Sequence, residues 1–295
     1  MSTIEKALQK QSQAKRANDK PVDSENAPVE AAVAPSTEVT QPTNANKALS
    51  ERLLSIDLAN LESRGYLVDT GTRKNIKDEF RLIKRKILNN AFGKAAKTLN
   101  HPNLIMVSSS KPHEGKTFVS INLALSIALE QDKTVLLIDA DVLRPSINRE
   151  LGLTESKGLI EYLLGETESA SEIIYSTNID KLKIVPAGEP HHLSNELLAS
   201  GKMESLAKEL AERYPDRVVI FDCPPLLGVT ETPVLANLVG QAVIVVEESK
   251  TKIEHIKKAT SQLNENLAMG YVLNKTIKTS KDVYGYYGYG YGSKD

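Results

Sequence analysis

The chain has 295 residues, of which 40% are hydrophobic, so it suits one globular domain with extensions or two small domains. Its formal net charge of −1 excludes an overall attraction to polyanions, and we expect no nucleic-acid partner. The single cysteine, Cys223, excludes an intramolecular disulfide framework and is typical of a reducing cytoplasm.

The N-terminal stretch, residues 1–48, predicts a short helix followed by a disordered linker. Ile4, Ala7 and Leu8 have helical spacing, so residues 3–16 form either a short amphipathic helix or a frayed terminus. Residues 17–48 are rich in Pro, Ala, Asn, Thr and Glu and contain too little apolar surface to fold. No run approaches the roughly 18 apolar residues of a membrane span, and the first residues lack a secretory signal. We therefore expect a cytoplasmic protein that reaches the inner face of the membrane through a partner.

Residues 49–100 predict a helical extension. Ile76, Phe80, Ile83 and Ile87 lie on one helical stripe, and the other faces carry the basic residues Arg81, Lys84, Arg85 and Lys86. A charge run of this kind indicates either a solvated helix face or a docking surface for an acidic partner.

Beyond residue 100, short Val/Ile/Leu-rich runs alternate with helical patterns. The runs are "LIMVSS", "TVLLIDAD", "LKIVPAG", "RVVIFDCPP", "AVIVVEE" and "GYVLN", and each is typical of a strand buried on both faces. The alternation predicts a doubly wound α/β domain with a mostly parallel sheet over residues 101–278. Ligands of such domains bind at the carboxyl ends of the strands.

The first run leads into "SSSKPHEGKTF" and then an amphipathic helix. Gly115-Lys116-Thr117 in this context predicts a phosphate loop, although Ser110 stands where the strict pattern has glycine. Successive backbone N–H groups and a helix N-terminus attract phosphate. Lys116 can reach the β and γ phosphates, and the Thr117 hydroxyl can ligate Mg²⁺.

Three aspartates follow apolar runs: Asp139, Asp141 and Asp222. A single one of them would be read as a helix cap or turn residue. Three on a sheet with a phosphate loop favour a Mg²⁺–nucleotide site, in which the metal ligands are Thr117, Asp139, Asp141 and Asp222. Asp139 and Asp141 are both candidates for metal ligand and general base.

The last residues, 279–295, form a predicted disordered tail with a dense tyrosine cluster: Tyr284, Tyr286, Tyr287, Tyr289 and Tyr291. Such a Gly/Tyr segment fits a flexible phosphorylation substrate, but also a sticker for self-association or for single-stranded nucleic acid.

Together these motifs resemble the bacterial tyrosine kinases, relatives of the deviant-Walker ATPases, over roughly residues 50–295. "DEFRLIKRKIL", "DADVLRPS" and "STIEKAL" are most similar to the kinases associated with exosortase and exopolysaccharide clusters. The resemblance implies a P-loop NTPase fold, ATP and Mg²⁺, and the chemistry of a non-specific protein-tyrosine kinase. The nucleotide-binding residues would be Ser110, Lys111, Pro112, His113, Glu114, Gly115, Lys116, Thr117, Phe118 and Asn274, and the catalytic residues Lys116, Asp139, Asp141 and Asp222.

The same resemblance implies that the tail tyrosines are phosphorylated in trans within a ring-like homo-oligomer, joined through Asp78, Arg81 and Lys84. It further implies regulation of exopolysaccharide synthesis or export, with a separate membrane chain-length-determinant protein as partner and a tyrosine phosphatase as opposing enzyme.

The chain departs from the family pattern at several places. Leu143 fills the position of an arginine and Arg144 follows it, His113 replaces a glycine, and Cys223 replaces Ser or Thr and is expected to be structural. Lys111 falls where partition-type and septum-positioning ATPases carry a lysine that reaches across a dimer. The alternative function is therefore an ATPase switch that dimerises on ATP without kinase activity.

Overall fold

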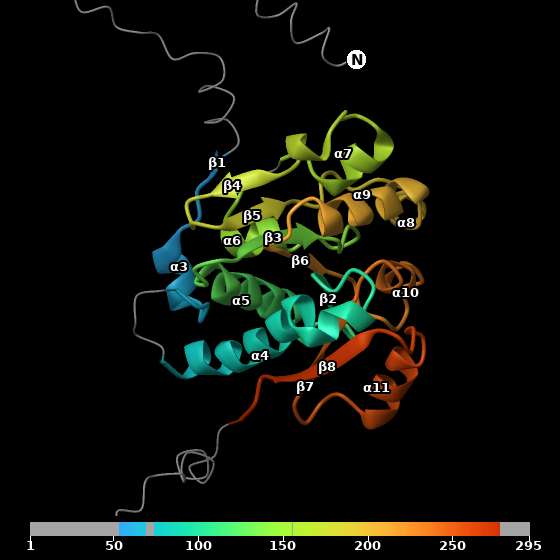
Figure 1. The fold of residues 1–295 in the computed structure, drawn as a ribbon. Helices are drawn as coiled ribbons and strands as arrows, with labels where there is room; N and C mark the ends of the chain where they lie inside the picture. Colours follow the sequence, from blue (N-terminus) through green and yellow to red (C-terminus); the bar gives the residue numbers. More distant parts are fainter. Residues whose placement is uncertain (1–52, 69–73, 155, 278–295) are drawn as a thin grey trace, which may run out of the picture. The chain divides into compact units, whose positions relative to one another are not determined.

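A computed structural model describes residues 53–68, 74–154 and 156–277 of the chain (Figure 1). The helix predicted at 3–16, the linker at 17–48 and the tail at 279–295 lie outside the described residues.

Within the described residues the strands form one eight-stranded sheet in the order β1-β4-β5-β3-β6-β2-β7-β8. All neighbouring strands are parallel except β4 and β5, which confirms the doubly wound, mostly parallel architecture. The strands are β1 (Leu53–Leu54), β2 (Leu104–Ser109), β3 (Thr134–Asp139), β4 (Tyr175–Thr177), β5 (Leu182–Val185), β6 (Arg217–Asp222), β7 (Gln241–Glu247) and β8 (Ala268–Asn274).

Helices cover both faces of the sheet and enclose two hydrophobic cores. In β2, Leu104 and Met106 enter one core, and Ile105 and Val107 enter the other, because successive side chains of a strand point to opposite faces. The first core lies under α7 (Leu159–Leu164), α8 (Ser194–Leu198), α9 (Gly201–Glu212), α10 (Glu231–Ala236) and α11 (Ile253–Thr260). The second lies under α3 (Leu58–Ser63), α4 (Lys74–Phe92), α5 (Lys116–Ala128) and α6 (Ile147–Leu151). Two short 3₁₀ helices, η1 (Lys94–Thr98) and η2 (Ala170–Glu172), complete the described elements.

The segment before α4 adds a strand to the sheet as well as helices. β1 pairs in parallel with β4, and the Asn178 side chain holds Ile56, two residues after β1, by accepting from its N–H at 2.8 Å and donating to its carbonyl at 3.0 Å. The prediction of a purely helical extension over 49–100 missed this strand, because a two-residue strand carries no periodicity.

Helix α4 packs against α5 through the predicted apolar stripe (Figure 1). Phe80 and Ile87 are buried, and Ile76 and Ile83 are half-buried. The prediction that Lys84 belongs to the exposed basic face was wrong. Its side chain is buried, and its Nζ donates to the Ser126 carbonyl at 3.0 Å and pairs with Glu130 at 2.5 Å.

Strand β8 also differs from the prediction that its run is buried on both faces. It forms an edge of the sheet, and Met269, Tyr271 and Leu273 are exposed. Among the described helices, none is long and apolar enough to cross a membrane.

Candidate active site

The loop between β2 and α5 has the backbone of a phosphate loop. Gly115 has φ = +96°, and a Cβ there would lie 2.0 Å from Nδ2 of Asn274, so only glycine fits. The carboxylate of buried Glu114 stabilises the loop, since it accepts hydrogen bonds from the Lys111 N–H at 2.9 Å and from the Thr251 hydroxyl. The loop therefore presents Lys116 and Thr117 at the N-terminus of a long buried helix.

Asn274, at the end of β8, reaches this loop. Its Nδ2 donates to the Glu114 carbonyl at 2.9 Å, and the next residue, Lys275, donates from Nζ to the His113 carbonyl at 2.7 Å. The carboxyl end of β8 thus lies against one side of the phosphate loop.

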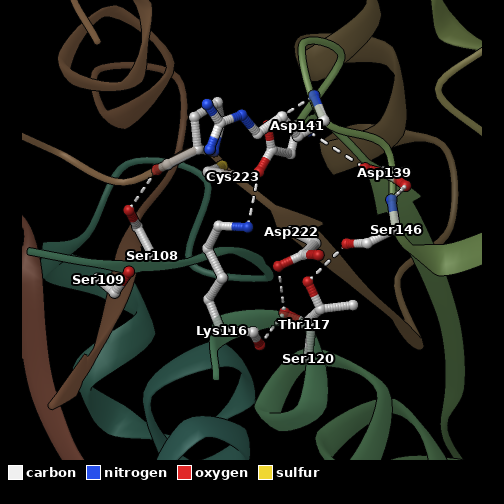
Figure 2. Close-up of polar contacts among 12 residues, drawn as sticks. Ser108, Ser109, Lys116, Thr117, Ser120, Asp139, Asp141, Ser146, Asp222 and Cys223 are labelled. Atoms are coloured by element: carbon white, nitrogen blue, oxygen red, sulfur yellow. Dashed lines mark hydrogen bonds and ion pairs between the residues drawn. The ribbon is translucent and has the colours of Figure 1, made fainter. Parts of the chain in front are cut away.

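Lys116 forms the central ion pair of the site. Its Nζ lies 2.6 Å from Oδ2 of Asp141, and Figure 2 shows the lysine extended from α5 toward that carboxylate. Burial alone would lower the pKa of Lys116, but the charges of Asp222 and Asp141 outweigh burial and raise it. Lys116 is therefore a permanent cation that balances the surrounding carboxylates.

Asp139 lies deeper than Asp141. Its carboxylate accepts backbone N–H groups from Asp141 at 3.2 Å and from Ser146 and Ile147 at 3.0 Å, so it fixes the turn after β3 and the start of α6. Burial, reinforced by the Asp222 charge, raises the pKa of Asp139.

Asp222 ends β6 beside the phosphate-loop helix (Figure 2). Oδ1 accepts the Ser120 hydroxyl at 3.0 Å, whereas Oδ2 is buried and has no hydrogen-bond partner among the described residues. Burial raises the pKa of Asp222, although nearby Lys116 offsets part of the rise. A buried carboxylate oxygen without a hydrogen-bond donor is costly. Oδ2 is suited to accept a hydrogen bond from a water molecule that is bound to a cation.

The residues present therefore fit Mg²⁺ bound together with nucleotide. Thr117 Oγ1 lies 2.8 Å from Ser146 Oγ in the same region as Asp222 (Figure 2). In the part of the chain that the structure describes, no group of three or more His, Cys, Asp or Glu side chains could hold a metal ion. The three carboxylates predicted as ligands therefore do not form a metal site by themselves. Phosphate oxygens and water would complete the coordination of Mg²⁺.

A cavity of about 800 Å³ opens in front of these groups. Of the predicted residues, it is lined by Pro112, His113, Gly115, Lys116, Thr117, Phe118 and Asp141. Ser110, Glu114, Asp139 and Asp222 are buried behind the lining, and Lys111 is exposed outside it. Asp141 is therefore the predicted carboxylate that faces the cavity.

Sequence reasoning missed three residues that line the cavity. Arg64 and Tyr66, from the segment after α3, line it together with Glu150 of α6. The Tyr66 hydroxyl donates to Glu150 Oε2 at 2.9 Å, and Arg64 pairs with the same carboxylate. These contacts join residues more than 80 positions apart, and no local pattern signals them. Ser146, which touches Thr117, lies within "DADVLRPS" and could have been found from its place in that motif.

Asp78, Arg81 and Cys223 are not among the residues that line the cavity. Asp78 and Arg81 form an exposed pair on α4 at 2.7 Å. Cys223 is fully buried, and burial raises the pKa of its thiol, so it is no nucleophile. The tail tyrosines lie outside the described residues.

Residues 102–278 match a family model described as an AAA domain. Among curated proteins, the chain is 34% identical over 186 residues to the tyrosine-protein kinase YwqD of Bacillus subtilis, covering 62% of this chain and 77% of YwqD. It is 30% identical over 219 residues to CapB of Staphylococcus aureus, covering 73% of this chain and 92% of CapB. It is 33% identical over 180 residues to the tyrosine-protein kinase ptk of Acinetobacter johnsonii, covering 60% of this chain but only 24% of that longer protein.

Solved structures agree with these relatives. The kinase domain of VpsO superposes with a TM-score of 0.55 at 28% identity, covering 68% of this chain and 99% of that domain. The chimerical protein CapA2B2 superposes with a TM-score of 0.63 at 23% identity, covering 80% of this chain and 99% of the chimera, and shows the shared fold. With the site described above, these matches show that the chain belongs to the family of bacterial tyrosine-protein kinases.

Proposed function

We propose that this chain transfers the γ-phosphoryl group of Mg·ATP to the tyrosines of its own C-terminal cluster, acting in trans between copies. The ion pair between Lys116 and Asp141 carries the proposal, because it places a phosphate-binding cation beside an inward-facing carboxylate at one cavity. Phosphoryl transfer needs positioning, charge neutralisation and a base for the acceptor hydroxyl, and these residues can supply all three.

Each group has a distinct part in this proposal. Lys116 binds the β and γ phosphates, which frees Asp141 from its ion pair, and Asp141 then accepts the phenolic proton. Thr117 and Asp222 would hold Mg²⁺, directly and through water, and the bound metal would supply charge neutralisation at the phosphates. Asp139 keeps Ser146 and α6 in place. Asn274, at the β8 side of the loop, is proposed to contact the adenine base.

The acceptor residues are Tyr284, Tyr286, Tyr287, Tyr289 and Tyr291. A tyrosine hydroxyl has a pKa of about 10, so a positioned carboxylate is needed to remove its proton. Glycines between the tyrosines leave the backbone free to extend into a neighbouring subunit's site.

We also propose a cellular setting that the family relationship supports. The copies assemble into a ring-like homo-oligomer through α4, with Asp78 and Arg81 at its exposed face. The ring acts at the inner face of the membrane with a separate chain-length-determinant protein, opposed by a tyrosine phosphatase, and regulates exopolysaccharide synthesis or export.

One experiment tests the kinase activity. The full chain is incubated with Mg·ATP and probed for phosphotyrosine, beside Lys116→Met and a variant with all five tail tyrosines changed to phenylalanine. We expect phosphotyrosine in the wild type and none in either variant alone. Mixing the two variants should restore it on the Lys116→Met chain, since the other variant supplies an intact site. A wild type that makes no phosphotyrosine even with the membrane partner supplied would refute the proposal.

Lys111 gives the ATPase switch a specific observation in its favour, because it is exposed at the phosphate loop, where a dimer partner could meet it. Lys111→Met distinguishes the two functions. The kinase proposal expects tyrosine phosphorylation to persist, since Lys111 does not line the cavity, whereas the switch expects loss of ATP-dependent dimerisation and no phosphotyrosine in any variant.

A further inference from the structure

The two margins of the sheet differ. β1 forms one margin and has only 2 residues, whereas β8 forms the other and has 7 (Figure 1). The sequence of β8, "AMGYVLN", contains no charged residue and no proline. Natural proteins usually keep a sheet edge short, charged or covered, because an open edge pairs with any strand that can reach it. Among the described residues nothing protects the edge of β8 in these ways, so it offers a place for a further strand.

Three alternate residues of β8 form this open edge: Met269, Tyr271 and Leu273. The first residue of β8 donates its N–H to the Gly240 carbonyl at 3.1 Å, and the carbonyl of the last accepts the Glu248 N–H at 3.0 Å. In a parallel pair, alternate residues bond to the same neighbour. The even-numbered residues of β8 therefore bond toward β7, and the three odd-numbered residues direct their N–H and C=O groups to the free edge.

The same three residues also expose their side chains. Met269 is 40% exposed, and Tyr271 and Leu273 are each 56% exposed. Because side chains two residues apart lie on one face of a strand, they form an apolar row, which we call the β8 row. The β8 row thus combines unpaired backbone groups with apolar side chains, as a strand-binding surface does.

The C-terminal tail has a pattern of the same period. Tyr287, Tyr289 and Tyr291 alternate with glycines, so the three rings lie on one face if this segment is extended. Tyr284 and Tyr286 would lie on the opposite face, since Tyr286 directly precedes Tyr287. Aromatic residues favour strands, and aromatic–aliphatic pairs across two strands stabilise their association.

The chain leaves β8 where it can return along the same strand. Lys275 has φ = +56°, a left-handed conformation that turns the chain out of the direction of β8. The Ile277 N–H donates to the Glu248 carboxylate at 2.7 Å, so the last described residue lies beside the carboxyl ends of β7 and β8. Residues 278–286 then supply the loop, and closing a loop of this length carries only a modest entropic cost.

We propose that residues 287–291 add to the sheet as a further strand, antiparallel to β8 of the same chain. The rings then lie on the β8 row, with Tyr287 on Leu273, Tyr289 on Tyr271 and Tyr291 on Met269. An antiparallel neighbour needs only a loop, whereas a parallel one needs a crossover connection. Glycine weakens strand pairing, so the docked segment can leave again.

The docked strand regulates phosphorylation of the tail, a consequence that rests on the proposed function. While docked, the three tyrosines are held at the sheet edge and cannot enter a neighbouring active site. Each phosphate adds about −1.5 to −2 charge. Residues two apart on a strand are about 7 Å apart, which is within the screening length of about 10 Å at 0.1 M salt. Phosphates on this face therefore repel one another and keep the tail away from the β8 row.

Hydrogen exchange of the β8 amides tests the docking without any turnover. In the full chain without nucleotide, the amides of the β8 row should exchange at least about tenfold more slowly than in a chain truncated after Lys281, because pairing protects an N–H. The amides of Gly270 and Val272 are the internal controls. Their N–H groups face β7, so they should exchange equally in the two chains.

Two charge-matched variants test which face of the tail docks. Tyr287→Glu combined with Tyr289→Glu should remove the protection of the β8 row. Tyr284→Glu combined with Tyr286→Glu is the matched control, since it adds the same charge at the same spacing on the opposite face. It should change the exchange rates less than twofold.

A third measurement tests the regulation. The Lys116→Met chain serves as acceptor, and the variant with five tail phenylalanines serves as enzyme. Adding Tyr271→Lys to the acceptor should raise its rate of phosphorylation about fivefold, because a charge on the edge prevents docking. Leu193→Lys in the acceptor is the control and should leave the rate unchanged, since Leu193 is exposed and lies outside β8.

The outcomes separate the inference from the kinase proposal. Equal exchange of the β8 row in the full and truncated chains overturns the docking and leaves the kinase intact. Protection that is lost on dilution assigns the edge to a second copy and also overturns it. Protection without a faster Tyr271→Lys acceptor overturns the regulatory part. If the wild type makes no phosphotyrosine, the proposed function fails, and hydrogen exchange still decides the docking.

Discussion

Asp139 and Asp141 are two residues apart, yet the structure gives them different surroundings. Asp139 is held by three backbone N–H groups, whereas Asp141 faces the cavity and pairs with Lys116. We predict that Asp141→Asn lowers tyrosine phosphorylation by at least about 100-fold while nucleotide binding persists, because the base is lost.

Asp139→Asn is the matched variant for that prediction. It should lose less activity and act through the position of Ser146 and α6. Phosphotyrosine formation and titration with a fluorescent ATP analogue check both variants. Equal losses, or a larger loss in Asp139→Asn, would exchange the two assignments.

The buried carboxyls also predict how stability depends on pH. Burial raises the pKa of Asp139 and of Asp222 in the folded protein, to about 7 and about 6. A folded-state pKa above the unfolded value means that the native protein holds these protons more tightly. Their contribution to stability is therefore present at low pH and is lost as the pH rises through the folded values.

We predict that, in EDTA and without nucleotide, Asp222→Asn flattens this dependence between about pH 4 and about pH 6, the interval between the ordinary and the folded-state pKa of this carboxyl, because an amide does not titrate there. Thermal unfolding at a series of pH values measures it. The wild type with saturating Mg·nucleotide should also show a flatter profile, since bound cation favours the charged carboxylate. Identical slopes for wild type and variant in EDTA would contradict the prediction.

At this scale, spacing in the sequence predicted residues that the structure places at one cavity, such as Lys116, Thr117 and Asp141, but not their individual contacts. Lys116 and Thr117 were placed by the glycine before them and by the strand and helix on either side. The backbone bonds of Asp139, the contact of Asn274 with Glu114, and the Arg64–Tyr66–Glu150 group depend on tertiary packing. No local pattern encodes such packing.

At the scale of elements, the basic residues of α4 have two different roles. Lys84 joins α4 to Ser126 and Glu130, whereas Arg81 is exposed one turn earlier. We predict that Lys84→Met lowers the free energy of unfolding by roughly 1–3 kcal/mol. The Ser126 carbonyl and the Glu130 carboxylate would lose the buried ammonium group that they bind.

Arg81→Ala is the comparison variant. It should change the free energy of unfolding by less than about 0.5 kcal/mol, as exposed substitutions usually do, and should weaken the proposed ring. Urea unfolding and sedimentation velocity separate the two effects. If Lys84→Met dissociates the oligomer at unchanged stability, Lys84 contacts a neighbouring copy after all.

The elements that the sequence predicted are those with strong periodicity. The stripe of Phe80 and Ile87 and the buried runs of β2, β3, β6 and β7 were recognisable without the fold. β1 was missed because two residues have no period, and β8 was expected to be buried because its composition does not reveal that it forms the edge.

For the whole molecule, the proposed reaction changes the charge of the chain. The formal net charge is −1 before modification. Each phosphate adds about −1.5 to −2, so five of them add roughly −8 to −10 to one short segment. In a ring these segments repeat around the assembly, and their mutual repulsion opposes association.

We predict that complete tail phosphorylation drives the subunits apart. Analytical ultracentrifugation before and after incubation with Mg·ATP measures the change, and the variant with five tail phenylalanines is the control that should keep its size. Salt provides the sharper test, because the screening length falls from about 10 Å at 0.1 M to about 3 Å at 1 M ionic strength. If repulsion causes the dissociation, high salt should restore the assembly of the phosphorylated chain. An unchanged oligomer despite full phosphorylation would contradict ring opening and would leave release of the tail from the active site as the consequence of the added charge.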